Sequence, residues 1–226
     1  MGSKAAQAAE TLTDIYNRLF DRYGPQHWWP GETPFEVVIG AILTQSTAWT
    51  NVEKAIDNLK AANALDPESL HKISTGELAA LIRPSGYYNA KALKLKTFID
   101  RLHDSYGGNL DRLFELDTND LRQELLSIHG IGLETADSIL LYAAHRPVFV
   151  IDAYTKRIIG RLGLATESDS YETFQRLFMG NLKHGEGLFN EYHALFVRHG
   201  KEVCRKVPKC DDCCLAGLFG KCHRTD

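Results

Sequence analysis

Cysteine is absent from the first 203 residues, and all five cysteines lie in the last 23. The chain also lacks any apolar run of the roughly 18 to 20 residues that a membrane helix needs. Its N-terminus lacks a basic segment followed by an apolar run, the mark of a secretion signal. These absences argue against a membrane protein and against disulfides, so we expect a cytoplasmic protein.

An excess of positive charge is also missing. The formal net charge is −3 and the pI is about 6.3, which argues against binding nucleic acid by overall electrostatics. Any such binding would have to come from local geometry. Residues 83–101 do carry a local net charge of plus 4, which fits either a phosphate contact or a solvated helix face. The basic residues of this patch are Arg83, Lys91, Lys94, Lys96 and Arg101, and its one acid is Asp100.

Helical periodicity runs along most of the chain, whose 44% hydrophobic and 24% charged content is ordinary for a globular protein. Apolar residues at spacings of three and four predict a first helix. These residues are Leu12, Ile15, Tyr16, Leu19, Phe20 and Tyr23. Next, Thr33, Pro34 and Glu36 predict a helix start with a capping box. The segment 35–43 is apolar nearly all round and predicts a buried central helix.

The remaining chain continues this pattern. Further helices are predicted at about 51–61, 88–106, 118–128, 134–144, 153–162, 171–182 and 188–199. Short loops containing Gly, Pro, Asn or Asp separate them. The only strand-like run is 148–151, which has no second run to pair with. The predicted fold class is therefore all-α.

Two glycines, Gly130 and Gly132, lie between two of the helical patterns. Glycines so close together allow a tight turn that leaves N–H groups facing outward at a helix N-terminus, where they can hold an anion such as phosphate. On its own, a Gly-x-Gly turn is more often a plain helix–helix connection.

Asp152 follows the apolar run 148–151 and precedes a helical segment, so taken alone it fits a helix N-cap. Together, however, the glycine hairpin and this aspartate resemble the helix-hairpin-helix, Gly-Pro-rich loop and Asp arrangement of the DNA glycosylases of the endonuclease III superfamily. The resemblance runs from about residue 12 to the cysteines.

This resemblance implies a two-domain all-α fold with the active site in a cleft between the domains. One domain, 1–30 with 145–203, would carry the catalytic Asp152. The second, 31–144, would be a helical bundle ending in the helix-hairpin-helix, and 204–226 would form an iron–sulfur cluster loop.

The implied chemistry is cleavage of an N-glycosidic bond after the base has been rotated out of the duplex. Such a bond breaks through a sugar with oxocarbenium character, which a fixed carboxylate such as Asp152 would stabilise, or for which it would orient water. In the lyase members of the family, a lysine lies immediately before the Thr-Ala pair of the second hairpin helix. Glu134 stands there in this chain, which predicts a monofunctional glycosylase with weak or absent lyase activity.

Within the superfamily, the chain is most similar to the 3-methyladenine DNA glycosylase III group. The similarity lies in Trp28-Trp29-Pro30 and in the segments 35–45, 83–91 and 152–154. It implies a base pocket of Trp28, Trp29, Pro30 and Trp49, to which we add Glu134 and Tyr154. Aromatic faces suit a cationic base such as N3-methyladenine. The alternative for the tryptophans is core packing.

Tyr154 replaces the histidine usual two residues after the aspartate in endonuclease III, which points away from oxidised pyrimidines. Gln45 matches a family glutamine that fills the gap left by the flipped base, although it also fits a polar residue that ends a helix. The predicted DNA-binding residues are Gln45, His129, Gly130, Ile131, Gly132 and Thr135.

The cysteine cluster demands a local explanation, and metal ligation is the leading one. Many superfamily members end in four cysteines around a [4Fe-4S] cluster, and the corresponding residues here are Cys204, Cys210, Cys213 and Cys222, with altered spacing. Cys214 is an alternative to Cys213. Resemblance favours iron–sulfur, while four thiolates also suit structural zinc.

The sequence thus predicts a monomeric base-excision-repair DNA glycosylase, nucleoid-associated, that acts on alkylated purines such as 3-methyladenine in double-stranded DNA. One alternative is an endonuclease III-like glycosylase for oxidised pyrimidines, uracil or mismatched bases. Another is a DNA-binding relative that has lost catalysis.

Overall fold

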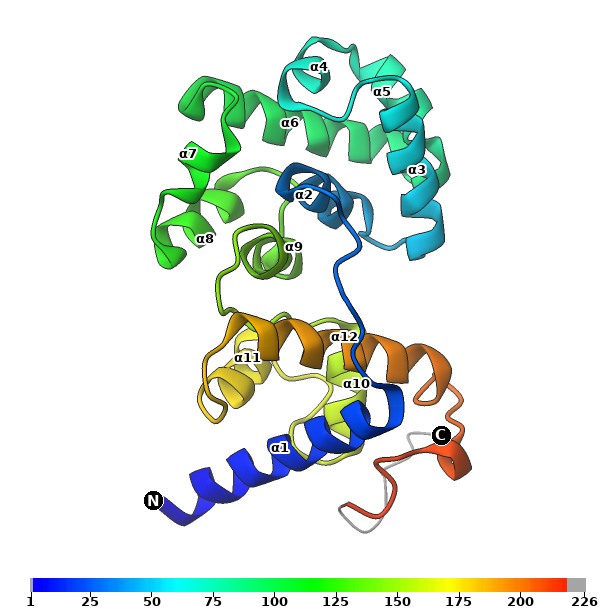
Figure 1. Cartoon of the computed structure of the whole chain (residues 1–226), viewed down its shortest axis with the longest axis vertical. Coiled ribbons are helices and arrows are strands. Elements are labelled where there is room, and N and C mark those ends of the chain that lie inside the picture. Colours follow the sequence, from blue (N-terminus) through cyan, green and yellow to red (C-terminus); the bar gives the residue numbers. More distant parts are fainter. Residues whose placement is uncertain (1, 219–226) are drawn as a thin grey trace. The chain divides into compact units, whose positions relative to one another are not determined.

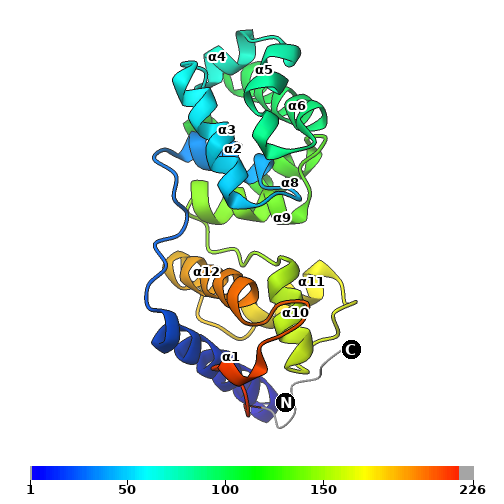
Figure 2. The ribbon, with the colours of Figure 1, turned by 90° about the vertical axis from the view of Figure 1, so that its right-hand side faces the viewer.

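The computed structural model describes residues 2–218, with side chains from residue 6 onward. Its chain forms two compact units, and all regular structure in the described residues is helical (Figures 1 and 2). The terminal unit consists of Met1–Trp28 and Pro147–Asp226, and the central unit consists of Trp29–Arg146. None of the helices in the described range is long and apolar enough to cross a membrane.

The central unit is built around one buried helix. Its elements are α2 (Pro34–Leu43), α3 (Trp49–Ala61), α4 (Pro67–Lys72), α5 (Thr75–Leu81), η1 (Arg83–Ser85), α6 (Tyr88–Tyr106), α7 (Leu110–Phe114), α8 (Thr118–Ser127), α9 (Leu133–Ser138) and the π-helical turn η2 (Ile139–Ala143). Every residue of α2 from Phe35 to Leu43 is buried, as the sequence predicts. Helices α3, α6, α9 and η2 pack against it and exclude water from its whole circumference.

The terminal unit joins the two ends of the chain. It contains α1 (Gly2–Tyr23), α10 (Ala153–Arg161), α11 (Tyr171–Met179), α12 (Glu186–Glu202) and η3 (Cys210–Asp212). Helix α12 packs against both α1 and α10, and the Tyr192 hydroxyl donates a 2.8 Å hydrogen bond to Leu12 O. The core is rich in aromatic rings, with Phe149 and Phe178 stacked 4.0 Å apart. Burial of such large rings is the main stabilising contribution available to this unit.

The predicted face of α1 is correct only in part. Leu12, Ile15 and Leu19 are buried, but Phe20 lies at the edge of the face and is 36% exposed. The helix also begins ten residues earlier than the apolar pattern, at Gly2.

The start of α2 confirms Thr33 as the N-cap and Pro34 in the first turn, but the capping box is wrong in its second half. Thr33 Oγ1 accepts from Glu36 N at 3.1 Å. The Glu36 carboxylate accepts from Glu32 N instead of Thr33 N, because it also pairs with Lys60 Nζ at 3.1 Å. A tertiary ion pair thus pulls this side chain away from the local motif.

The run Val148–Ile151 is buried and extended without joining a sheet. Side chains of α11 take the place of a partner strand: Gln175 Nε2 donates to Phe149 O at 2.9 Å, and Tyr171 Oη accepts from Ile151 N at 3.2 Å. These bonds satisfy backbone groups that would otherwise be buried without partners. They also hold the segment that leads directly into Asp152.

The helix-hairpin-helix consists of α8, the turn 128–132 and α9. Gly130 has φ +94°, a left-handed conformation that favours glycine, and a Cβ there would overlap the side chain of Lys94 on α6. Gly132 has φ −95° and open space around its Cα. The fully buried Asp137 on α9 binds Arg122 on α8 through two hydrogen bonds of 2.6 and 3.0 Å, which holds the two helices together.

We predict opposite outcomes for alanine at the two hairpin glycines. Gly130→Ala should destabilise the protein by about 1–3 kcal/mol, because the new methyl group strains the backbone and overlaps Lys94. Gly132→Ala is the matched control and should change stability by less than about 0.5 kcal/mol. Urea denaturation of the two variants and the parent measures both. Equal stabilities would contradict the geometry of the turn.

Candidate active site

Asp152 is the N-cap of α10, and its two carboxylate oxygens have different surroundings. Oδ1 accepts from Thr155 N at 2.7 Å, which is the capping bond. Oδ2 lies 3.7 Å from Nε2 of His193 on α12. The residue is only 8% exposed. The capping role and the proposed catalytic role are therefore compatible, because the cap uses one oxygen and fixes the direction of the other.

His193 is the partner of Asp152 that the sequence did not reveal. It is 6% exposed, and burial lowers its pKa, while the charge of Asp152 acts in the opposite direction. A neutral imidazole beside the carboxylate follows from this balance. No local signal could have identified this residue, because it lies 41 residues along the chain from Asp152, on a different helix, and meets Asp152 only through folding.

A hollow of about 480 Å³ opens at the hairpin of the central unit. It is lined by Gln45, Lys94 and all six residues of 130–135. Five of the six predicted DNA-binding residues therefore line this hollow, and the sixth, His129, is exposed next to them. Gln45 Nε2 donates to Gly130 O at 3.0 Å and to Thr135 Oγ1 at 3.1 Å, so its side chain is tied to the hairpin.

The predicted pocket aromatics of the central unit gather around Trp29. The Trp29 ring lies 5.0 Å from that of Trp49, edge to face, and 5.2 Å from that of Tyr142. It also covers Gly40 on α2, where a Cβ would come within 3.3 Å of the indole. Tyr142 was not among the predicted residues, because its position in an apolar helix reads as ordinary core.

Of the other predicted pocket residues, Trp28 and Tyr154 belong to the terminal unit, and Pro30 and Glu134 belong to the central unit. Trp28 is the last residue of the first segment of the terminal unit, and Pro30 is exposed. Glu134 is exposed beside the hairpin hollow. Tyr154 packs its ring against Gly200, with the Arg157 guanidinium 5.2 Å from the ring centre. Burial and the nearby charge of Asp152 raise the pKa of Tyr154, and Arg157 opposes them.

Tyr87 is a further feature that the sequence analysis missed. This side chain is 76% exposed, and its backbone has φ +45°, although tyrosine rarely adopts the left-handed conformation. Ser46, directly after Gln45, has a similar φ of +54°. Strained residues of this kind occur often at functional sites. Only the preceding Gly86 marks the turn in the sequence, so the strain itself was not predictable.

The cysteine segment follows α12 and is anchored by two arginines of α10. Arg157 Nε donates to Cys204 O at 2.8 Å, and Arg161 Nη1 donates to Arg205 O at 2.6 Å. Arg161 Nη1 also lies 3.3 Å from Cys204 Sγ. These contacts fix the start of the loop and place a positive charge beside a predicted ligand.

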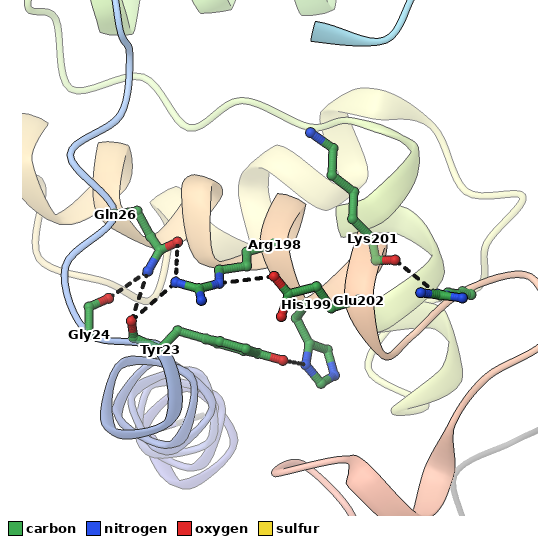
Figure 3. Close-up of polar contacts among 8 residues, drawn as sticks. Tyr23, Gly24, Gln26, Arg198, His199, Lys201 and Glu202 are labelled. Atoms are coloured by element: carbon green, nitrogen blue, oxygen red, sulfur yellow. Dashed lines mark hydrogen bonds and ion pairs between the residues drawn. The ribbon is translucent and has the colours of Figure 1, made fainter. Parts of the chain in front are cut away.

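A second donor faces Cys213. Figure 3 shows His199 of α12 hydrogen-bonded through Nδ1 to the Tyr23 hydroxyl, at 2.9 Å, and its Nε2 lies 3.5 Å from Cys213 Sγ. Burial lowers the pKa of His199 to about 4, so the ring is neutral at pH 7. In the same network, Arg198 bonds Tyr23 O and Gln26 Oε1 and pairs with Glu202, which joins the end of α1 to α12.

These donors suit sulfur ligands that carry charge, since N–H groups stabilise thiolates. Cys204, Cys210, Cys213 and Cys214 are all free of disulfides. Among residues 2–218, however, no three His, Cys, Asp or Glu side chains form a group that could hold a metal ion. The fourth predicted ligand, Cys222, lies outside the described residues. The donor chemistry therefore fits a metal cluster, and the described residues show no cluster geometry.

Comparison with known proteins agrees with this arrangement. Residues 39–184 match the HhH-GPD superfamily of base excision DNA repair proteins. The chain shares 48% identity over 205 residues with a candidate DNA repair glycosylase of Methanocaldococcus jannaschii, covering 90% of this chain and 93% of the relative.

Two solved structures share the fold. One is the Helicobacter pylori 3-methyladenine DNA glycosylase MagIII bound to 1,N6-ethenoadenine, with a TM-score of 0.73, 27% identity, and coverage of 88% of this chain and 97% of that one. The other is a trapped endonuclease III–DNA covalent intermediate, with a TM-score of 0.81, 22% identity and coverage of 96% of both chains. The chain therefore belongs to the HhH-GPD superfamily and is a base-excision-repair DNA glycosylase of the endonuclease III superfamily.

Proposed function

We propose that this glycosylase is monofunctional and removes alkylated purines such as 3-methyladenine from double-stranded DNA, with Asp152 as its catalytic carboxylate. The observation that carries the proposal is the geometry of Asp152. Its Oδ1 is committed to the helix cap at 2.7 Å, so Oδ2 keeps one direction without a further hydrogen bond to the backbone. A carboxylate held in this way is prepared to stabilise positive charge that develops on a sugar.

His193 would support this role by holding Oδ2. Its Nε2 is 3.7 Å away, and the neutral ring offers an N–H without adding a full positive charge. The carboxylate would then remain free to interact with an oxocarbenium-like sugar or with the attacking water. N3-methyladenine is a cationic leaving group, so a single carboxylate and no strong general acid suffices.

The aromatic group of Trp29, Trp49 and Tyr142 supports an alkylpurine substrate. A cationic base gains from stacking and cation–π attraction at such rings more than a neutral base does. The similarity to a 3-methyladenine DNA glycosylase that binds an ethenoadenine points to the same class of base. The position of Trp29 over Gly40 also fixes the ring that would form one wall of the pocket.

Glu134 supports the absence of efficient strand cleavage. The family's lyase mechanism needs an amine at this position to form a Schiff base with the sugar, and a carboxylate cannot do so. Lys156 does not supply a replacement, because its ammonium donates to Asp169 O at 3.1 Å and lies 5.4 Å from the Phe174 ring.

The DNA contacts of the central unit would come from the hairpin, from Gln45 and from the exposed Tyr87. The first turn of α9 has no side-chain cap at Gly132, so its N–H groups are available to a phosphate. Tyr87 offers a solvent-exposed aromatic face on which a base can stack.

An endonuclease III-like activity on oxidised pyrimidines, uracil or mismatched bases is the second candidate. The similarity to endonuclease III bound to DNA and the C-terminal cysteines favour it. The aromatic group and Glu134 favour the alkylpurine activity instead. A non-catalytic relative is the third candidate, and its prediction is a chain that binds DNA and releases no base.

Asp152→Asn should abolish base release while it preserves folding and DNA binding. Asparagine caps helices as well as aspartate does, so the substitution removes the charge and keeps the capping bond. We expect the single-turnover rate on methylated duplex DNA to fall by at least about a hundredfold. Asp66→Asn, at the capped start of α4, is the matched control and should leave the rate unchanged. Parental activity in Asp152→Asn would remove Asp152 from the mechanism.

The substrate and the lack of lyase activity can be measured in one assay. Methylated duplex DNA incubated with the protein should release free 3-methyladenine, and strand breaks should appear only after alkali. Duplexes with uracil, a mismatch or an oxidised pyrimidine complete the panel. Release from those duplexes alone would favour the second candidate, and breaks before alkali would contradict the monofunctional assignment.

We further propose a [4Fe-4S] cluster held by Cys204, Cys210, Cys213 and Cys222, with structural zinc as the alternative. When bound, such a cluster would act as a scaffold for the C-terminal loop. The choice of Cys213 over Cys214 rests on His199 Nε2, which lies 3.5 Å from Cys213 Sγ and donates to it in the tautomer whose Nδ1 accepts from the Tyr23 hydroxyl. Burial raises the pKa of Cys214, which disfavours its thiolate.

Metal analysis should therefore give about four irons per chain and a broad absorption band, both lost in Cys213→Ser. Cys214→Ser is the matched neighbouring control and should retain the iron. One zinc per chain in colourless protein would select the alternative, while iron lost from Cys214→Ser and kept in Cys213→Ser would exchange the two ligands.

A further inference from the structure

Most basic side chains of the patch at residues 83–101 are bonded to other groups of the central unit. Lys96 Nζ donates to the carbonyl oxygens of Leu70, His71 and Ile73, at 2.6 to 3.2 Å. Arg101 is paired with Glu124 through bonds of 2.6 and 2.9 Å. The charged groups of Lys96 and Arg101 therefore bind other parts of the protein and are not available to a ligand.

Lys91 is likewise committed, but without a counter-charge. It is 2% exposed, and its Nζ donates to Leu43 O at 2.8 Å, Thr47 Oγ1 at 2.6 Å and Ser85 O at 2.6 Å. All three ammonium protons are thus used, and all three acceptors are neutral. Burial and repulsion from Lys94 lower the pKa of Lys91 to about 8.

Lys94, one turn further along α6, differs from these residues because its ammonium faces the hairpin hollow. Its stem packs on Gly130, and its Nζ donates to Gln45 Oε1. The amide nitrogen of Gln45 in turn donates to Gly130 O and Thr135 Oγ1. Gln45 is therefore clamped at both ends of its amide, by Lys94 on one side and by the hairpin on the other.

Neither Lys91 nor Lys94 takes part in an ion pair among the described side chains, residues 6–218. Two cations one turn apart, one of them buried, leave a local positive charge that no ion pair of the described residues neutralises. Such an arrangement is costly unless an anion from outside completes it.

We propose that Lys94 binds a DNA backbone phosphate, and that its bond to Gln45 prevents this contact until Gln45 moves away. When Gln45 leaves the hairpin to fill the gap in a duplex, it releases the ammonium of Lys94, which then pairs with a backbone phosphate at the hollow. The two events are one exchange, so the contact forms only on DNA that has a gap to fill. This inference rests on the proposed function, because it takes duplex DNA as the ligand and Gln45 as the gap-filling residue.

The exchange predicts a salt dependence that differs between two duplexes. The probes are an undamaged duplex and the same duplex with one stable abasic-site analogue. Each phosphate contact contributes a slope of about 0.9 to the plot of log Kd against log salt concentration. The parent protein should therefore show a slope steeper by about 0.9 on the abasic duplex than on the undamaged one.

Three variants isolate the contact. Lys94→Met keeps the stem that packs on Gly130 and should give the same, shallower slope on both duplexes. Lys94→Arg should restore the difference. Gln45→Ala frees Lys94 at all times and should give the steeper slope on both duplexes. Lys96→Met is the matched control, because the ammonium of Lys96 already donates to carbonyl oxygens of the protein. This variant should show the same salt slopes as the parent on both duplexes.

Several outcomes would overturn the proposal. An unchanged slope for Lys94→Met on the abasic duplex would show that Lys94 meets no phosphate, and equal losses on both duplexes would show that Gln45 does not control the contact. Circular dichroism and thermal melting of every variant exclude misfolding as the cause, and Lys94→Arg provides a second test if Lys94→Met does not fold. Failure of the proposed function is distinguishable, because a parent protein that binds neither duplex would fail before any variant is compared.

Discussion

The hydrogen bond from the Thr155 amide to Asp152 Oδ1 is the interaction on which the proposed chemistry depends. At this bond the buried extended run 148–151 ends and α10 begins, and the same bond fixes the orientation of the Asp152 carboxylate. Gln175 and Tyr171 hold the run from one side, and α12 brings His193 to the second oxygen. A helix cap is ordinarily a local device, but the packing of α10 on α12 here makes it the support of the carboxylate that we propose as catalytic.

In the central unit, too, charged side chains form hydrogen bonds that hold the fold together. Helix α6 carries several lysines, yet most of their ammonium groups satisfy carbonyl oxygens at the ends of neighbouring helices. The bonds from Lys91 to Leu43 O and Ser85 O lie next to the loop after α2 and the turn before α6, where Ser46 and Tyr87 have positive φ. An acidic protein can therefore carry a local positive charge at one place, and Lys94 at the hairpin is the cation that we propose for a DNA phosphate.

Local patterns predicted the long elements well and the short ones poorly. Helices α3, α6, α8, α10 and α12 lie where apolar periodicity placed them, within a few residues at most ends. Helices α4, α5 and α7 were missed, because five to seven residues hold too few apolar positions to show a period, although Ser74 and Glu77 form a complete capping box. At Glu36 the box failed, because Lys60 competes for the carboxylate.

The sequence alone determined the all-helical class, the glycine hairpin, the place of Asp152 before a helix and the grouping of the cysteines. Each of these is written in neighbouring residues through spacing, backbone freedom or capping chemistry. Tertiary structure alone decided that His193 meets Asp152, that Tyr142 joins Trp29 and that Lys94 holds Gln45. The two residues of each pair lie tens of residues apart, and only the packing of helices brings their side chains within reach. No local pattern could therefore have predicted these contacts.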